Sequence, residues 1–267
     1  MEFNFLFYPV IFLFGLVAGS FLNCVIYRLE ASKSFLKGRS FCPHCEHQLN
    51  WQDLIPLLSF LILKGKCRYC QKPISSQYPL VELATGILFL YVWQVGGESF
   101  SILFNWVVTC FLIIIFVYDL RHYIIPDRVI YSAIGVAFLY RVFEALAVNH
   151  WPLGFEISSL AIPLLSAFGA ATFFLTIVLI SQGRWMGVGD IKLVFLMGLI
   201  LGWPNILAAL FLAFFIGAIF GIALIIAGRK TLKSEVPFGP FLVVGTFIAL
   251  FWGQEVINWY LNFFLLK

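Results

Sequence analysis

The chain has 267 residues, of which 62% are hydrophobic and only 11% are charged, whereas an average soluble domain has roughly 25% charged residues. With 31 Phe, 8 Trp and 10 Tyr and a mean hydropathy of +0.98, it has too little polar surface to cover a globule in water. This composition excludes a soluble, a disordered or a disulfide-scaffold protein. The net charge of +4 is too small to argue for nucleic acid. Membrane lipid is therefore the first expected partner.

Apolar runs predict eight transmembrane helices, because roughly 20 apolar residues cross a bilayer as a helix. The sixth run is too short alone, but Gly187 and Gly189 before it allow the helix to begin earlier, and the Gly202-Trp203-Pro204 turn separates it from the seventh. We therefore expect an all-α polytopic membrane protein with one small cytoplasmic domain between the first and second helices. In chain order, the runs cover about residues 5–27, 79–95, 101–118, 128–148, 158–180, 191–202, 205–227 and 238–264.

The distribution of Lys and Arg predicts the orientation in the membrane, because cytoplasmic connections carry an excess of these residues. Of the 17 basic residues, 15 lie on one set of connections and only Lys267 on the other. Arg141 lies within the fourth segment, where a pair with Glu144 would lower the cost of its burial. Both termini are thus expected to be external. The 15 residues are Arg28, Lys33, Lys37, Arg39, Lys64, Lys66, Arg68, Lys72, Arg121, Arg128, Arg184, Lys192, Arg229, Lys230 and Lys233.

The first segment is expected to be uncleaved. Residues 1–8 contain no basic residue and no small-residue cleavage site, and a secretory signal peptide has both.

The one sizeable polar region, residues 28–77, carries a local charge of +5 and contains two Cys-x-x-Cys motifs. Two residues between thiolates let both sulfurs reach one metal ion, and a second such motif completes a tetrahedral site. We predict a structural zinc ion bound by Cys42, Cys45, Cys67 and Cys70. A closed shell of four thiolates leaves no open position for a substrate, and a domain of about fifty residues has little core of its own.

Other interpretations of these cysteines stay open. His44 and His47 offer a rival pair of ligands. A disulfide is less favoured, because a cytoplasmic domain lies in a reducing compartment. Cys24 and Cys110 lie within apolar segments and receive no function.

Two acidic residues lie where apolar segments meet cytoplasmic connections, and an acid at such a position is costly unless it has a task. Asp119 ends the third segment, and Asp190 begins the sixth in Gly187-Val188-Gly189-Asp190. Two neighbouring carboxylates cannot both ionise easily, so one stays protonated while the other activates water, as in aspartyl proteases. The glycines let an extended peptide approach the backbone closely.

Purely structural roles are the alternative for these acids. Asp119 fits a solvated boundary residue, and Asp190 fits a helix-start carboxylate favoured by the helix dipole. Asp127 follows Pro126, and for it the helix N-terminal role is the better interpretation. Glu82 is expected to be a first-turn acid of the second segment.

Taken together, the motifs resemble those of the type IV prepilin peptidases, the leader peptidases and N-methyltransferases among the Gly-x-Gly-Asp membrane aspartyl proteases. The resemblance extends over nearly the whole chain, and the order of the motifs is more specific than any one of them. A cysteine at position 24, where a residue such as Val is expected, is a small departure. The motifs are Gly19-Ser20-Phe21-Leu22-Asn23-Cys24-Val25-Ile26-Tyr27-Arg28, the two Cys-x-x-Cys motifs, Tyr78-Pro79-Leu80-Val81-Glu82, Asp119 with Ile125-Pro126-Asp127, Gly187-Val188-Gly189-Asp190-Ile191-Lys192 and Pro237-Phe238-Gly239-Pro240.

The resemblance implies that Asp119 and Asp190 are the catalytic pair and that the four cysteines bind zinc. It implies cleavage of type IV prepilins or type II secretion pseudopilins after a Gly at the cytoplasmic face, and indirect work with the pilus or secretion machinery. It further implies that the new amino terminus is then methylated, with S-adenosylmethionine as the methyl donor. No Gly-rich loop after a strand marks a methyl-donor site. The implied division is a first helix over 1–27, a zinc domain and methyltransferase region over 28–78, and a seven-helix peptidase domain over 79–267.

Two other classes of function would each account for part of this pattern. An ion-coupled transporter also uses paired acids, but it is expected to place them near the midplane in repeated halves, and no repeat is visible. A membrane-anchored zinc scaffold would explain the cysteines without either aspartate.

Capture of a precursor is expected to use its apolar helix, which partitions into lipid and sets the depth of the cleaved bond. The polar region 28–77, with its local charge of +5, would repel a basic leader. The basic residues of this region are therefore expected to face anionic lipid. Asp119, Asp127 and Glu82 are then the acids expected to attract the leader. The alternative is recognition by the apolar segment alone.

Overall fold

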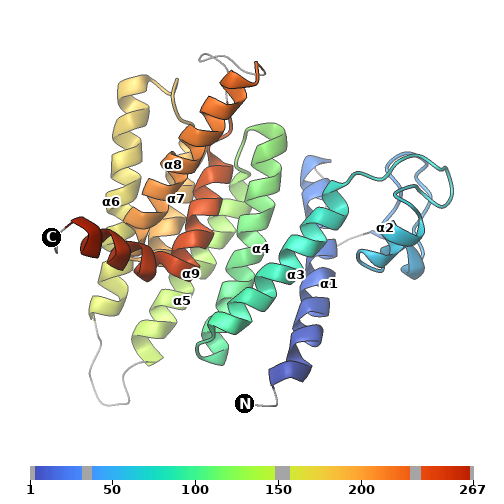
Figure 1. Ribbon diagram of the computed structural model, residues 1–267, viewed down its shortest axis with the longest axis horizontal. Coiled ribbons are helices and arrows are strands. Elements are labelled where there is room, and N and C mark those ends of the chain that lie inside the picture. The colour runs from blue at the N-terminus through green and yellow to red at the C-terminus, as the bar shows by residue number, and fades with distance from the viewer. Residues whose placement is uncertain (1–3, 32–37, 148–156, 229–235, 265–267) are drawn as a thin grey trace. The chain divides into compact units, whose positions relative to one another are not determined.

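The computed structural model describes residues 4–31, 38–147, 157–228 and 236–264 (Figure 1). Over these residues the chain is helical, with two isolated β-bridges and no strand. Six of the basic residues used to predict orientation, Lys33, Lys37, Arg229, Lys230, Lys233 and Lys267, lie outside them. The elements are α1 (Asn4–Glu30), η1 (Trp51–Leu54), α2 (Leu58–Ile62), α3 (Gln77–Val95), α4 (Ser99–His122), α5 (Asp127–Ala147), α6 (Ile157–Ser181), α7 (Val188–Leu201), α8 (Asn205–Ile226) and α9 (Gly239–Phe264).

Each of the eight predicted apolar segments corresponds to one of these helices, so the all-α membrane fold is confirmed. Within the described residues, seven helices are long and apolar enough to cross a membrane. The eighth, α7, has 14 residues and a length of about 21 Å, against the roughly 30 Å of a hydrocarbon core. It begins at Val188, inside the Gly-x-Gly-Asp motif, as the glycines suggested.

The chain divides into two compact units, residues 1–114 and 115–267. In the first unit, α1 and α3 pack side by side, and the small polar domain with η1 and α2 lies between them in sequence (Figure 1). Small residues allow this close packing, as is common between membrane helices. A methyl group at Gly15 or Gly19 would lie 2.7 Å from the Cα atom of Gly86 or Glu82 on α3.

In the second unit, α7 packs against α5, α6, α8 and α9. Most of its side chains from Leu193 to Leu201 are buried. Gly198 lets α7 approach α6 closely, because a methyl group there would overlap the backbone of Ala167. Gly245 does the same for α9 against Ala209 of α8. A short helix enclosed by longer neighbours is thus the core of this unit, and Asp190 lies in its first turn.

Candidate active site and metal site

Asp119 and Asp190 lie in the second unit, at the C-terminal end of α4 and the N-terminal end of α7. Asp119 is 4% exposed and Asp190 is 8% exposed. The two carboxylates are close enough to interact electrostatically. The structure therefore brings together the two acids that the sequence paired. The alternative in which Asp119 is a solvated boundary residue does not agree with its burial.

Two residues from other segments complete the surroundings of this pair. The backbone N–H of Gly239, the first residue of α9, donates to the Asp119 carboxylate. Ile125 packs against both glycines of the site, with its Cδ1 atom 3.5 Å from where a Cβ atom would stand at Gly189 and at Gly239. Four segments thus meet around the carboxylates: the C-terminal end of α4, the connection that precedes α5, the N-terminal end of α7 and the N-terminal end of α9.

Asp190 also has the structural role of a carboxylate at the start of a helix. Its Oδ2 atom accepts a hydrogen bond from the N–H of Gly187 at 3.1 Å, which caps the start of α7. The neighbouring cation, Lys192, instead pairs with Asp127 at 2.6 Å and lies over the ring of Tyr131. Asp127 is the first residue of α5, as predicted. The cap and the pair fix the N-terminal ends of α5 and α7 beside each other.

The far end of α7 is held by Arg141 of α5. The predicted pair with Glu144 is present at 2.6 Å. The guanidinium also donates to the carbonyl oxygens of Leu199, at 2.8 Å, and of Ile200, at 2.5 Å. Carbonyls of the last turn have no partner within their own helix, so this cation caps the C-terminal end of the helix that carries Asp190. The sequence predicted the ion pair but gave no signal for these bonds.

The start of α9 is held in place by packing between aromatic side chains. The ring of Phe238, which precedes Gly239, packs on Phe214 of α8 at 5.0 Å between centroids and on Phe174 of α6 at 6.3 Å. Phe174 is fully buried. This packing holds Gly239 against Asp119, which gives the Pro237-Phe238-Gly239-Pro240 motif a physical role.

The four cysteines of the first unit form a cluster. Their sulfur atoms all lie within 4.8 Å of one another, and those of Cys42 and Cys70 are 3.9 Å apart. A tetrahedral ion with metal–sulfur bonds of about 2.3 Å would separate its sulfurs by about 3.8 Å. The cluster is therefore able to hold a metal ion. His47 stacks on the ring of Tyr69 at 3.7 Å, and neither histidine of the rival ligand set belongs to the cluster.

The two Cys-x-x-Cys motifs share one backbone structure. The N–H of Cys42 donates to the carbonyl of His47, and the N–H of Cys67 donates to that of Lys72, both at 2.9 Å. The residue after each second cysteine, Glu46 or Gln71, has a positive φ. Burial would raise the pKa of the Cys42 thiol, but backbone hydrogen bonds from His44 and Cys45 lower it to about 7. Such bonds favour the thiolate, which is the form that binds metal.

Asp53 links the second motif to the segment that precedes η1. Its carboxylate accepts hydrogen bonds from the side chain of Arg68 at 2.7 Å, the hydroxyl of Tyr69 at 3.0 Å and the N–H of Asn50 at 3.1 Å. Burial opposes ionisation, but these donors hold the pKa of Asp53 below its usual value.

Glu82 differs from the sequence-based expectation. It lies beyond the first turn of α3 and is 7% exposed, so its prediction as a first-turn acid was wrong. Its Oε2 atom accepts the N–H of Leu57 at 2.8 Å, and Ser20 of α1 is a second hydrogen-bond partner. Leu57 has a φ of 58°, which is unfavourable for a branched side chain. The buried carboxylate thus holds this strained residue of the polar domain against α1 and α3, a tertiary role that no local pattern indicates.

Two protein-family models match the chain, one in its N-terminal part and one in its C-terminal part. The model of the Bacterial Peptidase A24 N-terminal domain matches residues 13–95, and that of the Type IV leader peptidase family matches residues 106–222. The chain is 32% identical to a protein of Aeromonas hydrophila, over 97% of this chain and 96% of that protein. It is 34% identical to one of Bacillus subtilis, over 95% and 97%. Both relatives are named prepilin leader peptidase/N-methyltransferase. No solved structure matches.

Proposed function

Because the chain belongs to the type IV leader peptidase family, we propose that it is a membrane-embedded aspartyl endopeptidase that removes the leader of type IV prepilins or type II secretion pseudopilins. It cleaves after a Gly at the cytoplasmic face and then methylates the new amino terminus. The observation that carries the proposal is the pairing of Asp119 and Asp190, two buried carboxylates from different helices that interact electrostatically.

The two aspartates act as one unit in the proposed mechanism. The ionised carboxylate takes a proton from a water molecule, and the oxygen of that water attacks the carbon of the scissile carbonyl. The protonated carboxyl group donates a hydrogen bond to the oxygen of that carbonyl. Asp119 and Asp190 each accept one backbone N–H, from Gly239 and Gly187 respectively. This similarity gives neither residue a distinct role, and the pair titrates jointly.

The surroundings of the aspartate pair favour a mechanism in which the depth of the precursor in the membrane selects the peptide bond that is cleaved. Gly187 is exposed, and a methyl group there would meet no atom closer than 3.8 Å, so an extended substrate backbone has room beside Asp190. Of the acids expected to attract a basic leader, Glu82 is buried and Asp127 is paired with Lys192. The apolar segment of the precursor, which partitions into lipid, then supplies most of the recognition.

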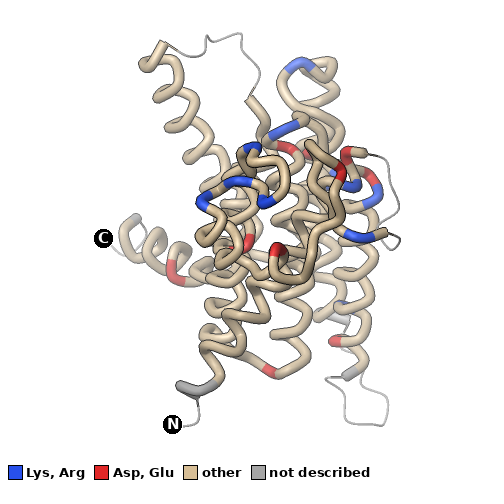
Figure 2. The backbone as a smooth tube through the Cα atoms, turned by 90° about the vertical axis from the view of Figure 1, so that its right-hand side faces the viewer, with Lys and Arg blue, Asp and Glu red and all other residues tan. Residues whose placement is uncertain are grey.

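Zinc is the proposed metal of the cysteine cluster, with a structural role. Four thiolates complete its coordination shell, and the ion would join Cys42 and Cys45 to Cys67 and Cys70 across a domain with little core of its own. Figure 2 marks the Lys and Arg positions in blue along the backbone. The basic residues of this domain are proposed to face anionic lipid.

S-Adenosylmethionine is the proposed methyl donor, since the relatives are named N-methyltransferases. When bound, it would supply an electrophilic methyl group to the amine nitrogen, and it would leave as a neutral thioether while one proton is released. The protein's task is to hold the donor and a neutral amine together.

The orientation and the domain limits are part of the proposal. Both termini are external, with the zinc domain and the ends of α4 and α7 that carry the aspartates at the cytoplasmic face of the inner membrane. This topology requires α7 to complete a crossing together with the residues around it. The proposed division is 1–27 for the first helix, 28–78 for the zinc domain and methyltransferase region, and 79–267 for the peptidase domain.

Mass spectrometry of a pilin precursor incubated with the protein in membranes tests this function. The expected product lacks the leader after a Gly, and with S-adenosylmethionine added it carries one methyl group on the new amino terminus. An uncut precursor in the presence of correctly inserted protein would refute the peptidase assignment. Proton or ion flux that depends on the aspartates without cleavage would instead favour the transporter.

A further inference from the structure

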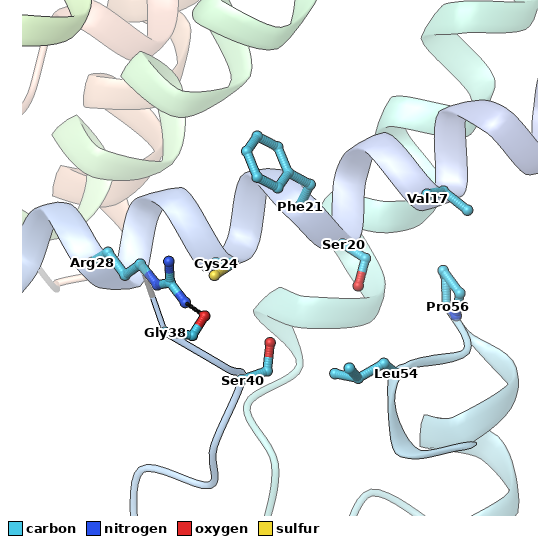
Figure 3. Close-up of a pocket in the computed structure, with 9 residues that line it drawn as sticks. All are labelled: Val17, Ser20, Phe21, Cys24, Arg28, Gly38, Ser40, Leu54 and Pro56. Carbon is cyan, nitrogen blue, oxygen red and sulfur yellow. Dashed lines mark hydrogen bonds between the residues drawn. The ribbon is translucent and has the colours of Figure 1, made fainter. Parts of the chain in front are cut away.

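A cavity of about 450 Å³ lies in the first unit, between α1 and two segments of the polar domain (Figure 3). Five of its residues come from one face of α1, because they recur at the spacing of helical turns. The others come from residues 38–40 and 54–56 of the polar domain. The lining residues are Val17, Ser20, Phe21, Cys24, Arg28, Gly38, Ser40, Leu54 and Pro56.

The two ends of the cavity differ in chemistry. Arg28, Gly38 and Ser40 form a polar end, and Val17, Leu54 and Pro56 form an apolar end (Figure 3). The Arg28 guanidinium donates to the carbonyl of Gly38 at 2.7 Å, so this cation is held at the polar end. Ser20 lies between the ends, while the ring of Phe21 projects away from the polar domain (Figure 3). The cavity therefore suits an elongated ligand with an anionic end and an apolar end.

The wall formed by Leu54 and Pro56 is fixed by the buried carboxylate of Glu82. That carboxylate accepts the N–H of Leu57, which follows Pro56, and interacts with Ser20 on the opposite wall. It thus ties both walls together and places a carboxyl group behind Ser20, near the middle of the cavity. A cationic centre in the middle of a ligand would favour the ionised form of this group and be attracted to it.

We propose that this cavity is the binding site for the methyl donor, S-adenosylmethionine, an inference that rests on the methyltransferase half of the proposed function. The amino-acid carboxylate of the donor pairs with Arg28, the adenine ring lies against Val17, Leu54 and Pro56, and the sulfonium lies near Ser20 and the Glu82 carboxylate. A volume of 450 Å³ lies within the roughly 300–1,000 Å³ typical of cofactor pockets. The cavity also gives Cys24 a place, as a small residue in its wall.

Equilibrium binding of radiolabelled S-adenosylmethionine to the full-length protein in nanodiscs tests the site without any catalytic readout. Arg28→Gln is expected to weaken binding at least tenfold, because it removes a charged hydrogen-bond donor from the carboxylate. Arg39→Gln is the matched control, since Arg39 is exposed, lies between two lining residues and is not itself part of the cavity wall; its affinity should stay within twofold. Zinc content reports whether each variant has kept its fold.

Direct ultraviolet photolabelling of the unmodified protein with radiolabelled S-adenosylmethionine keeps the inference testable if Arg28→Gln loses its zinc. Label is expected in peptides that contain the lining residues of α1, from 17 to 28, or those of the polar domain, from 38 to 56. Excess S-adenosylhomocysteine should prevent it. Label confined to other peptides, or equal affinity in a folded Arg28→Gln protein, would overturn the assignment while leaving the methyltransferase function intact. Failure of the unmodified protein to bind the donor would refute that function and the site together, although cleavage of precursor would still support the peptidase.

Discussion

Gly239 provides the sharpest structural test of the candidate active site outside the aspartates themselves. A methyl group at this position would overlap the Asp119 carboxylate, with its Cγ atom only 3.1 Å away, and would also meet Ile125 at 3.5 Å. Gly239→Ala therefore forces the carboxylate and the start of α9 apart. The substitution adds no charge and removes no side chain.

The expected cost falls on catalysis rather than on folding. Normal van der Waals contact requires the carboxylate to move by roughly 1 Å, a displacement that can cost about 100-fold in rate, or about 2.7 kcal/mol of transition-state stabilisation. Alanine also favours a helix over glycine by roughly 0.5–1 kcal/mol, so the midpoint of thermal unfolding should change little. Asp119 would be present but misplaced with respect to Asp190.

Rates of precursor cleavage in membranes, together with thermal unfolding in detergent, measure both effects. Gly135→Ala is the matched control, because it makes the same change on α5, where no atom lies within 4 Å of the added carbon. We expect normal cleavage for Gly135→Ala and a loss of about 100-fold for Gly239→Ala. Equal cleavage by the two folded variants would show that the contact between Gly239 and Asp119 does not position the carboxylate.

Three further predictions concern the metal site and the support of α7. Cys67→Ser should lower zinc content well below one ion per chain, whereas Cys110→Ser, which changes a thiol outside the cluster, should leave it unchanged by elemental analysis. Arg141→Gln should lower the free energy of unfolding by about 3 kcal/mol, since it breaks charged bonds to two carbonyls and to a carboxylate; Arg184→Gln, at an exposed position, should change it by less than about 0.5 kcal/mol. Asp53→Asn should speed loss of zinc to a chelator severalfold, because it weakens the bonds that hold the second Cys-x-x-Cys motif.

Local patterns predicted the helices and the cluster of four cysteines. Apolar runs marked the helices because lipid requires each crossing segment to satisfy its own backbone. The cysteine spacing predicted the sulfur cluster, since two residues between cysteines constrain each pair locally. The ion pair of Arg141 with Glu144 was predictable for the same reason: its partners lie one helical turn apart.

Contacts between distant segments were not predictable from one sequence. The bonds from Arg141 to Leu199 and Ile200 depend on how α5 packs against α7, and no local pattern encodes that packing. Burial of Glu82 depends likewise on the position of Leu57 in the polar domain. The proximity of Gly239 to Asp119 joins segments 120 residues apart, from 119 to 239, and only the folded chain shows it.

Cleavage of a pilin precursor by separate Asp119→Asn and Asp190→Asn variants tests the central claim most directly. Asparagine keeps the size of each side chain but provides neither an ionised base nor a carboxylic acid. We expect each variant to insert in the membrane and keep its zinc, while cleavage falls at least a thousandfold, as expected when a member of a catalytic unit is removed. Near-normal cleavage by either variant would contradict the account, because a single aspartate would then suffice.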